Sequence, residues 1–306
     1  MWIGESAIVS VGTTEKIDGT KGDQPRGNQV LRNLIHEVGI FGKQTAGYVQ
    51  AMTAQTTLRH NVMFNGPRAG INFLDGFGGG SLVESNALWN WVRETGDHGP
   101  FNSWDRQAYL TDVRTGKPSL VPAQNNITRN LLFNSYSSTW PLDHDDGSCY
   151  YTDTKNFMVY GGYKNYLGHS KTVQDNVYVH PEWRAGAFGG DAGMCVQDVG
   201  QTQTAMWGEE WSRNTCIFGG SEAHPHGEGG QAKIGDFGAS PHKLSATNNV
   251  YFLPKGTTAT LDFGGASSKV TLAQAQAGGT DKGSTVGPTP TDEAIVAMGK
   301  ALLAPY

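Results

Sequence analysis

The sequence predicts an all-β fold, a solenoid in the form of a parallel β-helix, and two observations carry this prediction. An asparagine followed by a short apolar segment recurs along most of the chain, as in Asn61-Val62-Met63-Phe64. Glycine accounts for 42 of the 306 residues, about twice its usual share, whereas charged residues make up only 17%. This composition favours many tight turns over long, salt-bridged helices.

The asparagine repeat has the period of a solenoid coil. Four of its seven intervals fall between roughly 20 and 28 residues, about one coil of three short strands, and the longer intervals fit a coil with an inserted loop. We expect each asparagine to adopt the left-handed backbone of a turn, at low cost for this residue, and its side chain to bond its stacked neighbours. An all-β sandwich is the alternative, but few Asn-Gly or Asp-Gly hairpin turns are present. The repeat comprises Asn33, Asn61, Asn86, Asn130, Asn156, Asn176, Asn214 and Asn249.

The chain is predicted to form a single domain over residues 1–306, with coils over about 25–265 and a C-terminal extension over 266–306. In the extension, Thr289-Pro290-Thr291-Asp292 precedes a segment with apolar residues at helical spacing. Proline and acidic residues at its start predict a short amphipathic helix. Because an exposed last coil would be an aggregation edge, we expect this helix to cap it or to dock along the flank.

Two stretches carry a resemblance to a known superfamily. The stretches Leu58-Arg59-His60-Asn61-Val62-Met63-Phe64-Asn65 and Arg68-Ala69-Gly70-Ile71-Asn72-Phe73 resemble the coil repeat of the right-handed parallel β-helix, or pectate-lyase-like, superfamily. The resemblance covers roughly residues 25–265 and implies right-handed coiling and a carbohydrate-active protein. That superfamily includes polysaccharide lyases, inverting glycoside hydrolases, esterases, epimerases and non-enzymatic adhesins. The known glycosidase and lyase motifs are not clearly matched, so the resemblance specifies no family.

Composition and charge limit the kinds of partner that the protein is expected to bind. The net charge of -5 and the lack of a Lys/Arg-rich run argue against nucleic acid. No apolar run approaches the roughly 18 residues of a membrane span. The N-terminus shows no signal peptide, although the sequon Asn126-Ile127-Thr128 fits secretion. We therefore expect an extracellular protein whose partner is a polysaccharide or oligosaccharide.

The three cysteines give little information. Cys149, Cys195 and Cys216 are odd in number and lack metal-ligand spacing, so at most one intrachain disulfide is possible. We expect each to be a buried small hydrophobe, and we predict no metal site.

Two polar clusters are the candidate functional site. The first spans residues 94–106, and the second is Asp143-His144-Asp145-Asp146-Gly147-Ser148. If each Gly-x-polar segment is the first strand of its coil, both clusters join one stack with residues 46–50, 69–75 and 163–169. Coils are about 4.8 Å apart, so the acids of the two clusters would lie on the order of 5–10 Å from one another.

Paired carboxylates in such a stack indicate glycoside hydrolysis, in which one acid protonates the leaving oxygen and the other activates water or attacks. Asp145 and Asp146 would point to opposite faces of a strand unless Gly147 turns the backbone. The candidate catalytic residues are Asp97, His98, Asp105, Arg106, Asp145 and Asp146. The candidate substrate-binding residues are Gln50, Arg68, Asn72, Asp75, Asn102, Trp104, Asp143, His144, Lys164 and His169.

Two alternatives stay open. A polysaccharide lyase would neutralise a uronate with Ca²⁺ or a cationic side chain and remove a proton with Lys, Arg, His or Tyr. A non-catalytic structural or adhesive β-helix is the other alternative. The hydrolase is preferred because the cleft of a lyase for an acidic polymer should be more basic than these clusters are. The hydrolase requires no cofactor.

Overall fold

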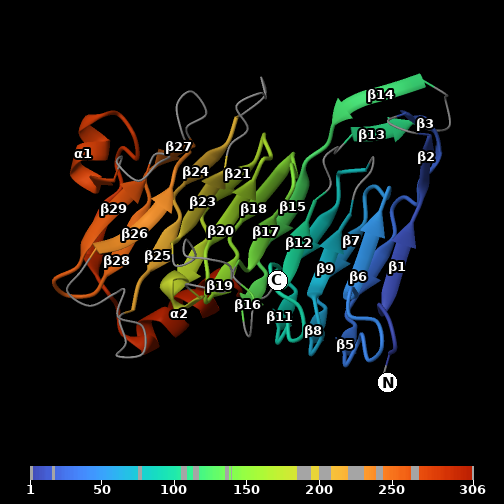
Figure 1. The fold of residues 1–306 in the computed structure, drawn as a ribbon, viewed down its shortest axis with the longest axis horizontal. Helices are drawn as coiled ribbons and strands as arrows, with labels where there is room; N and C mark the ends of the chain where they lie inside the picture. Colours follow the sequence, from blue (N-terminus) through green and yellow to red (C-terminus); the bar gives the residue numbers. More distant parts are fainter. Residues whose placement is uncertain are drawn as a thin grey trace.

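The computed structural model is a parallel β-helix whose coils stack along one long axis (Figure 1). It describes residues 3–15, 18–74, 78–104, 109–112, 117–134, 138, 140–184, 194–199, 208–219, 231–238, 244–262 and 269–304. Each complete coil contributes one strand to each of three sheets, and neighbouring strands of a sheet come from successive coils. The predicted all-β solenoid is confirmed.

The first sheet contains β1 (Ile8–Val11), β6 (Ala46–Ala51), β9 (Ala69–Phe73), β12 (Phe101–Ser103), β17 (Leu142–His144), β20 (Tyr163–Tyr166), β23 (Val196–Val199), β26 (Gln231–Asp236), β29 (Thr258–Asp262) and β30 (Val270–Thr271). The second contains β4 (Gln29–Leu31), β7 (Thr57–Arg59), β10 (Leu82–Glu84), β15 (Asn125–Thr128), β18 (Tyr151–Thr154), β21 (Thr172–Gln174), β24 (Glu210–Ser212) and β27 (Ser245–Thr247). The third contains β5 (Leu34–His36), β8 (Val62–Phe64), β11 (Ala87–Trp89), β16 (Leu131–Phe133), β19 (Phe157–Val159), β22 (Val177–Val179), β25 (Thr215–Ile217), β28 (Val250–Leu253) and β31 (Thr285–Pro288).

Smaller elements decorate the coils. The strands β2 (Thr13–Glu15) and β3 (Asp18–Asp23) form one antiparallel hairpin, and β13 (Tyr109–Asp112) and β14 (Lys117–Pro122) form another. Both hairpins project at the same end of the coil stack (Figure 1). The short 3-10 helix η1 spans Pro181–Arg184, and the helices α1 and α2 span Leu272–Ala277 and Asp292–Leu302.

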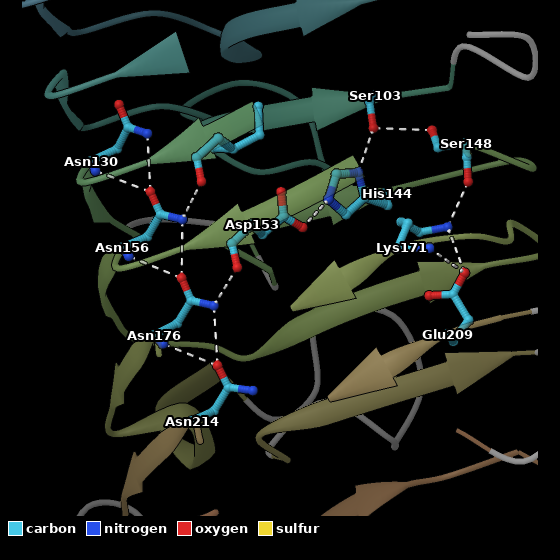
Figure 2. Close-up of polar contacts among 11 residues, drawn as sticks. Ser103, Asn130, His144, Ser148, Asp153, Asn156, Lys171, Asn176, Glu209 and Asn214 are labelled. Atoms are coloured by element: carbon cyan, nitrogen blue, oxygen red, sulfur yellow. Dashed lines mark hydrogen bonds and ion pairs between the residues drawn. The ribbon is translucent and has the colours of Figure 1, made fainter. Parts of the chain in front are cut away.

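The repeat asparagines form a buried hydrogen-bonded ladder at the turn between the second and third sheets (Figure 2). The Oδ1 of Asn156 accepts from the backbone N and from Nδ2 of Asn130, both at 3.0 Å. Its Nδ2 donates to Ile127 O at 2.8 Å and to Asn176 Oδ1 at 3.0 Å. The backbone-to-side-chain bonds run from Asn33 to Asn249. The predicted ladder is confirmed.

The prediction that these asparagines adopt a left-handed backbone conformation is wrong. In the described part of the chain the left-handed residue is the one before each repeat asparagine, for example His60 with φ 57° and Lys155 with φ 57°. The asparagine is selected instead for its amide, which bonds both neighbouring coils. The turn residue before it varies in type, which its αL backbone tolerates at a modest cost.

The interior of the coils is an apolar core. In the first sheet, Tyr48, Ile71, Phe101, Leu142 and Tyr163 occupy one register column and are at most 1% exposed. Because side chains alternate across a strand, the residues between these columns point outward. This alternation decides which predicted site residues reach the outer face.

The helix α2 confirms the predicted C-terminal helix. Thr291 caps its N-terminus, and Ile295 packs on Phe157, Val177, Val179 and Ile217 of the third sheet. The helix therefore docks along the flank of the coils. The short helix α1, which was not predicted, begins with a capping box between Thr271 and Gln274 and packs against the last strands of the first sheet.

Two of the three cysteines form a disulfide, which corrects their expected role as buried small hydrophobes. Cys195 precedes β23, Cys216 lies in β25, and both are 0% exposed. Cys149 is buried and free.

Candidate functional site

One column of side chains on the outer face of the first sheet gathers four predicted residues. Asn72, Asn102, Asp143 and Lys164 are aligned in register on β9, β12, β17 and β20. They alternate with core residues, so they point away from the interior. The strands that the repeat predicts for this sheet do stack in the expected order.

Lys164 is the centre of a cluster that also contains Asp97, Asp143 and Asp145, hereafter the Lys164 cluster. Its Nζ lies 2.9 Å from Asp143 Oδ1, 3.0 Å from Asp145 Oδ1 and 4.0 Å from Asp97 Oδ1. Asn102 Nδ2 donates to the other oxygen of Asp143 at 2.9 Å. The predicted approach of residue 97 to residues 143–146 is therefore present in the structure.

Exposure divides the three carboxylates. The Asp143 side chain is 0% exposed, that of Asp145 is 19% exposed and that of Asp97 is 48% exposed. Asp143 thus forms the buried floor of the cluster, while Asp97 and Asp145 are open to solvent. The last two are the carboxylates that a dissolved molecule can reach.

Burial changes the protonation of the cluster. Burial raises the pKa of Asp143 to about 6, although Lys164 opposes this. Burial also raises the pKa of Asp97, again against Lys164. Burial lowers the pKa of Lys164, but Asp143 and Asp145 more than offset it and leave the pKa above its ordinary value. The lysine is therefore a permanent cation beside two carboxyl groups, Asp143 and Asp97, whose pKa values are raised.

Two further predicted residues belong to this region. Arg68 is 7% exposed and interacts electrostatically with Asp97, Asp143 and Asp145. Burial, followed by the charge of Arg68, lowers the pKa of His98 to about 3, so its imidazole is neutral near pH 7. Arg68 Nε and His98 Nδ1 are buried without a hydrogen-bond partner. Both atoms therefore have unused hydrogen-bonding capacity, although neither is exposed to solvent.

Two aromatic residues that the sequence reasoning missed contact the same lysine. Lys164 Nζ lies 4.6 Å from the ring centre of Trp140 and 5.4 Å from that of Tyr166, both within cation–π range. The period of two in Tyr163-Lys164-Asn165-Tyr166 places Lys164 and Tyr166 on the same face. That alternation was the signal that could have identified Tyr166.

The remaining predicted residues of the outer face are dispersed. Asp146 adopts φ 43° at the turn before Gly147, and its charge acts on Asp97. Trp104 follows β12, and its Nε1 is buried without a hydrogen-bond partner. His169 forms an isolated β-bridge with Cys149, and its ring contacts Tyr150 and Ser170 Oγ. Asp75, Asp105 and Arg106 lie outside the described residues.

Gln50 and His144, expected to bind substrate, point into the interior instead. They share a register column with Phe73 and Ser103, on the same face as the core residues. Gln50 is 4% exposed and accepts a bond from the Tyr48 hydroxyl. His144 is 0% exposed. The alternation that places Asp143 outside places His144 inside.

His144 belongs to a buried interior network that the sequence did not reveal (Figure 2). Its Nδ1 is hydrogen-bonded to Ser103 Oγ at 2.7 Å and its Nε2 to Asp153 Oδ2 at 2.8 Å. Ser103 Oγ also contacts Ser148 Oγ at 3.0 Å. Ser148 O accepts from Lys171 Nζ at 2.5 Å, and Lys171 pairs with Glu209 Oε1 at 3.4 Å.

The interior network contains a Ser-His-Asp chain, but it has no access to a dissolved substrate. Ser103, His144 and Asp153 are all 0% exposed. Burial lowers the pKa of His144, although Asp153 opposes it. These three residues therefore satisfy one another's hydrogen bonds inside the coils. The outer Lys164 cluster is the candidate functional site.

Two hollows lie elsewhere on the surface. One of about 440 Å³ is bordered by Arg32, His60 and Arg129, and one of about 520 Å³ lies between α2 and the third sheet. No member of the Lys164 cluster lines either hollow. Among the residues that the structure describes, no group of three or more His, Cys, Asp or Glu side chains is arranged to hold a metal ion. The described helices include none that is long and apolar enough to cross a membrane.

Comparison with known proteins adds no relative. No family model, curated protein or solved structure matches the chain.

Proposed function

We propose that the Lys164 cluster is the catalytic centre of a glycoside hydrolase acting on an extended polysaccharide. The observation that carries this proposal is the placement of two solvent-accessible carboxylates, Asp97 and Asp145, within 4.0 Å of one lysine nitrogen. Glycoside hydrolysis needs two carboxyl groups, one acting as an acid and the other as a base or nucleophile. The first sheet would align the polymer across successive coils.

The two carboxylates differ in the way this chemistry needs. The raised pKa of Asp97 suits the general acid that protonates the leaving oxygen. Asp145, paired with Lys164 at 3.0 Å, suits the carboxylate that activates water or attacks the sugar. Asp143, which accepts a hydrogen bond from Asn102, holds the lysine in place from below. Tyr166, 36% exposed, offers an apolar face for a sugar ring.

The same proposal includes membership of the pectate-lyase-like superfamily and secretion. The three stacked parallel sheets support the first. The buried Cys195–Cys216 disulfide supports the second, because such bonds persist in oxidising compartments.

A polysaccharide lyase is the second candidate, and Arg68 is the observation that favours it. Its buried guanidinium has an unpartnered Nε beside the cluster, where it could neutralise a uronate carboxylate. The three carboxylates of the cluster oppose this assignment, because they would repel an acidic polymer.

The test is to replace Asp97 and Asp145 by Asn, singly, and to measure release of reducing ends from a panel of polysaccharides. We expect each variant to lose about 100-fold or more of the parent's activity while its thermal unfolding changes little. Asp175→Asn is the matched control, because Asp175 is a partly exposed carboxylate paired with Arg213 away from the cluster.

Three outcomes would contradict the hydrolase. Full activity in both variants would remove Asp97 and Asp145 from the chemistry. Products that absorb as unsaturated uronides would indicate the lyase. A parent that neither cleaves nor saturably binds any glycan would be a structural β-helix.

A further inference from the structure

The turn between β20 and β21 brings an amine, a carboxamide and a carboxyl group together inside the coils. Lys171 directly precedes β21, and Glu209 directly precedes β24 in the next coil, so the two residues are stacked neighbours. Asn165 lies on β20 and points inward, in register with His144. All three residues are at most 2% exposed.

Their polar atoms surround Gly168. Lys171 Nζ contacts Ser148 O at 2.5 Å and Glu209 Oε1 at 3.4 Å (Figure 2). Asn165 Oδ1 accepts from Gly168 N at 3.2 Å, and Asn165 Nδ2 donates to Asp198 Oδ1 at 2.7 Å. A Cβ at Gly168 would lie less than 3.0 Å from both Lys171 Nζ and Asn165 Oδ1. The amine and the amide are therefore neighbours, and glycine is required between them.

We propose that Lys171 and Asn165 condense into an intramolecular amide bond between Nζ and Cγ, with Glu209 carrying the protons. The net reaction joins an amine to a carboxamide and releases ammonia, and it needs no oxidant, reductant or cofactor. It would be a self-modification of the folded chain, because only folding brings the three groups together. It involves no member of the Lys164 cluster, so it stands or falls independently of the proposed hydrolase.

The proposed steps balance with these three side chains alone. Glu209 takes one proton from the Lys171 ammonium, and the neutral amine attacks Asn165 Cγ. The π electrons of the carbonyl move to Oδ1, which the Gly168 N–H stabilises as an oxyanion-hole donor does. Glu209 then donates its proton to Nδ2 and accepts one from Nζ. The C–O double bond re-forms, the Cγ–Nδ2 bond breaks with its electron pair, and ammonia leaves.

The surroundings suit this proton transfer. Burial raises the pKa of Glu209 to about 7 despite the opposing charge of Lys171, which allows it to gain and lose a proton near neutral pH. The product amide replaces a buried cation with a neutral group, and departure of ammonia makes the reaction irreversible.

The decisive measurement is the intact mass of the denatured, reduced parent chain. We expect it to be lower than the sequence mass by one molecule of ammonia. Trypsin should release residues 165–184 as one ammonia-deficient peptide, uncut after Lys171, because an acylated lysine is not cleaved. Cleavage after Lys155, an exposed lysine, is the internal control for complete digestion.

Variants separate the bond from other causes of the same mass loss. Lys171→Arg should restore the full mass expected for its sequence, whereas a succinimide at Asn165 would persist. Glu209→Gln should keep Lys171 unreacted, because the amide cannot shuttle protons.

A parent with the unmodified sequence mass would overturn the proposal. So would loss of water in place of ammonia, which would indicate a Lys171–Glu209 bond, and so would ammonia loss that persists in Lys171→Arg. Ammonia loss in Glu209→Gln would overturn the role of Glu209.

Discussion

At the scale of single residues, burial decides which groups around the Lys164 cluster carry charge. Asp143 lies at the floor of the cluster with a pKa of about 6, and His98 stays neutral with a pKa of about 3. Both shifts arise mainly from loss of water, and neighbouring charges modify them. As a result Lys164 stays positively charged, and the more exposed carboxylates of Asp97 and Asp145 lie within 4.0 Å of its Nζ.

The depressed pKa of His98 predicts a pH dependence of stability. Between about pH 6.5 and 3 the unfolded chain binds a proton at His98 that the folded chain does not, so the folded state is stabilised above this range and loses stability as pH falls through it. The loss is at most about 1.4 kcal/mol per pH unit. His98→Gln should therefore lose less stability than the parent between neutral pH and pH 4.5, measured by urea unfolding.

The matched control for this prediction is His60→Gln. His60 is exposed, so its replacement should leave the pH profile of the parent unchanged. Asp143 and Glu209, whose raised pKa values act in the opposite direction, are common to all three proteins and cancel in the comparison. Equal acid sensitivity of His98→Gln and the parent would refute this account of His98.

At the scale of elements, the asparagine ladder holds each coil to the next where the chain passes from the second sheet to the third. Asn156 makes four side-chain bonds, two accepted from Asn130 and two donated to Ile127 O and Asn176. Every partner atom is buried, so removing the amide leaves donors and acceptors without water to replace it. The ladder is thus a continuous element that runs perpendicular to the strands.

Asn156→Ala should lower the free energy of unfolding by about 3 kcal/mol or more, because each buried group left unpaired costs roughly 1–3 kcal/mol. Denaturant unfolding measures this. Asn126→Ala is the matched control, since Asn126 lies on β15 but is exposed, and we expect it to change stability by less than about 0.5 kcal/mol. Similar losses in the two variants would show that the ladder contributes no special stability.

The strands and the ladder were predictable because they depend on local periodicity. An asparagine before each apolar segment indicated both the coil length and the stacking, and the strands around Gly47, Gly70 and Tyr163 follow this pattern. Strand limits were harder to predict. The second cluster was expected to lie on one strand of the stack, but β17 ends at His144 and Tyr151 begins β18 in the second sheet. His144 is the last residue of β17 and points into the core because it alternates with Asp143.

The candidate site was predictable only where its members share one face of one sheet. Asp143 and Lys164 met this condition on β17 and β20, whereas Asp97 and Asp145 reach the same lysine from the segments that precede β12 and follow β17. The interior network does not share one face of one sheet. Asp153 and Glu209 reach it from the side of the second sheet, across the interior of the coil. Such contacts depend on how the chain wraps, and sequence spacing does not encode that directly.

At the scale of the whole molecule, the sheets are held together by the shared core and by one covalent bond across it. The Cys195–Cys216 disulfide joins the chain before β23 of the first sheet to β25 of the third, across a sequence separation of 21 residues. Its segment includes the second-sheet strand β24, so the bond closes the three-sheet wrap of one coil. A cross-link of this size restricts the unfolded chain enough to stabilise the fold by about 3 kcal/mol.

Replacing both Cys195 and Cys216 by Ala should therefore lower the free energy of unfolding by about 3 kcal/mol, beyond the packing lost with two buried sulfur atoms. Cys149→Ala measures that packing loss, because Cys149 is buried and free. Reductant should weaken the parent towards the double variant without affecting the variant itself. If the parent's unfolding were insensitive to reductant and the double variant lost no more per cysteine than Cys149→Ala, the coil would be held by its core and ladder alone.

Because the sulfur atoms are enclosed by the coil, we expect reduction to proceed only through unfolding, so its rate should follow the unfolding rate as denaturant is raised.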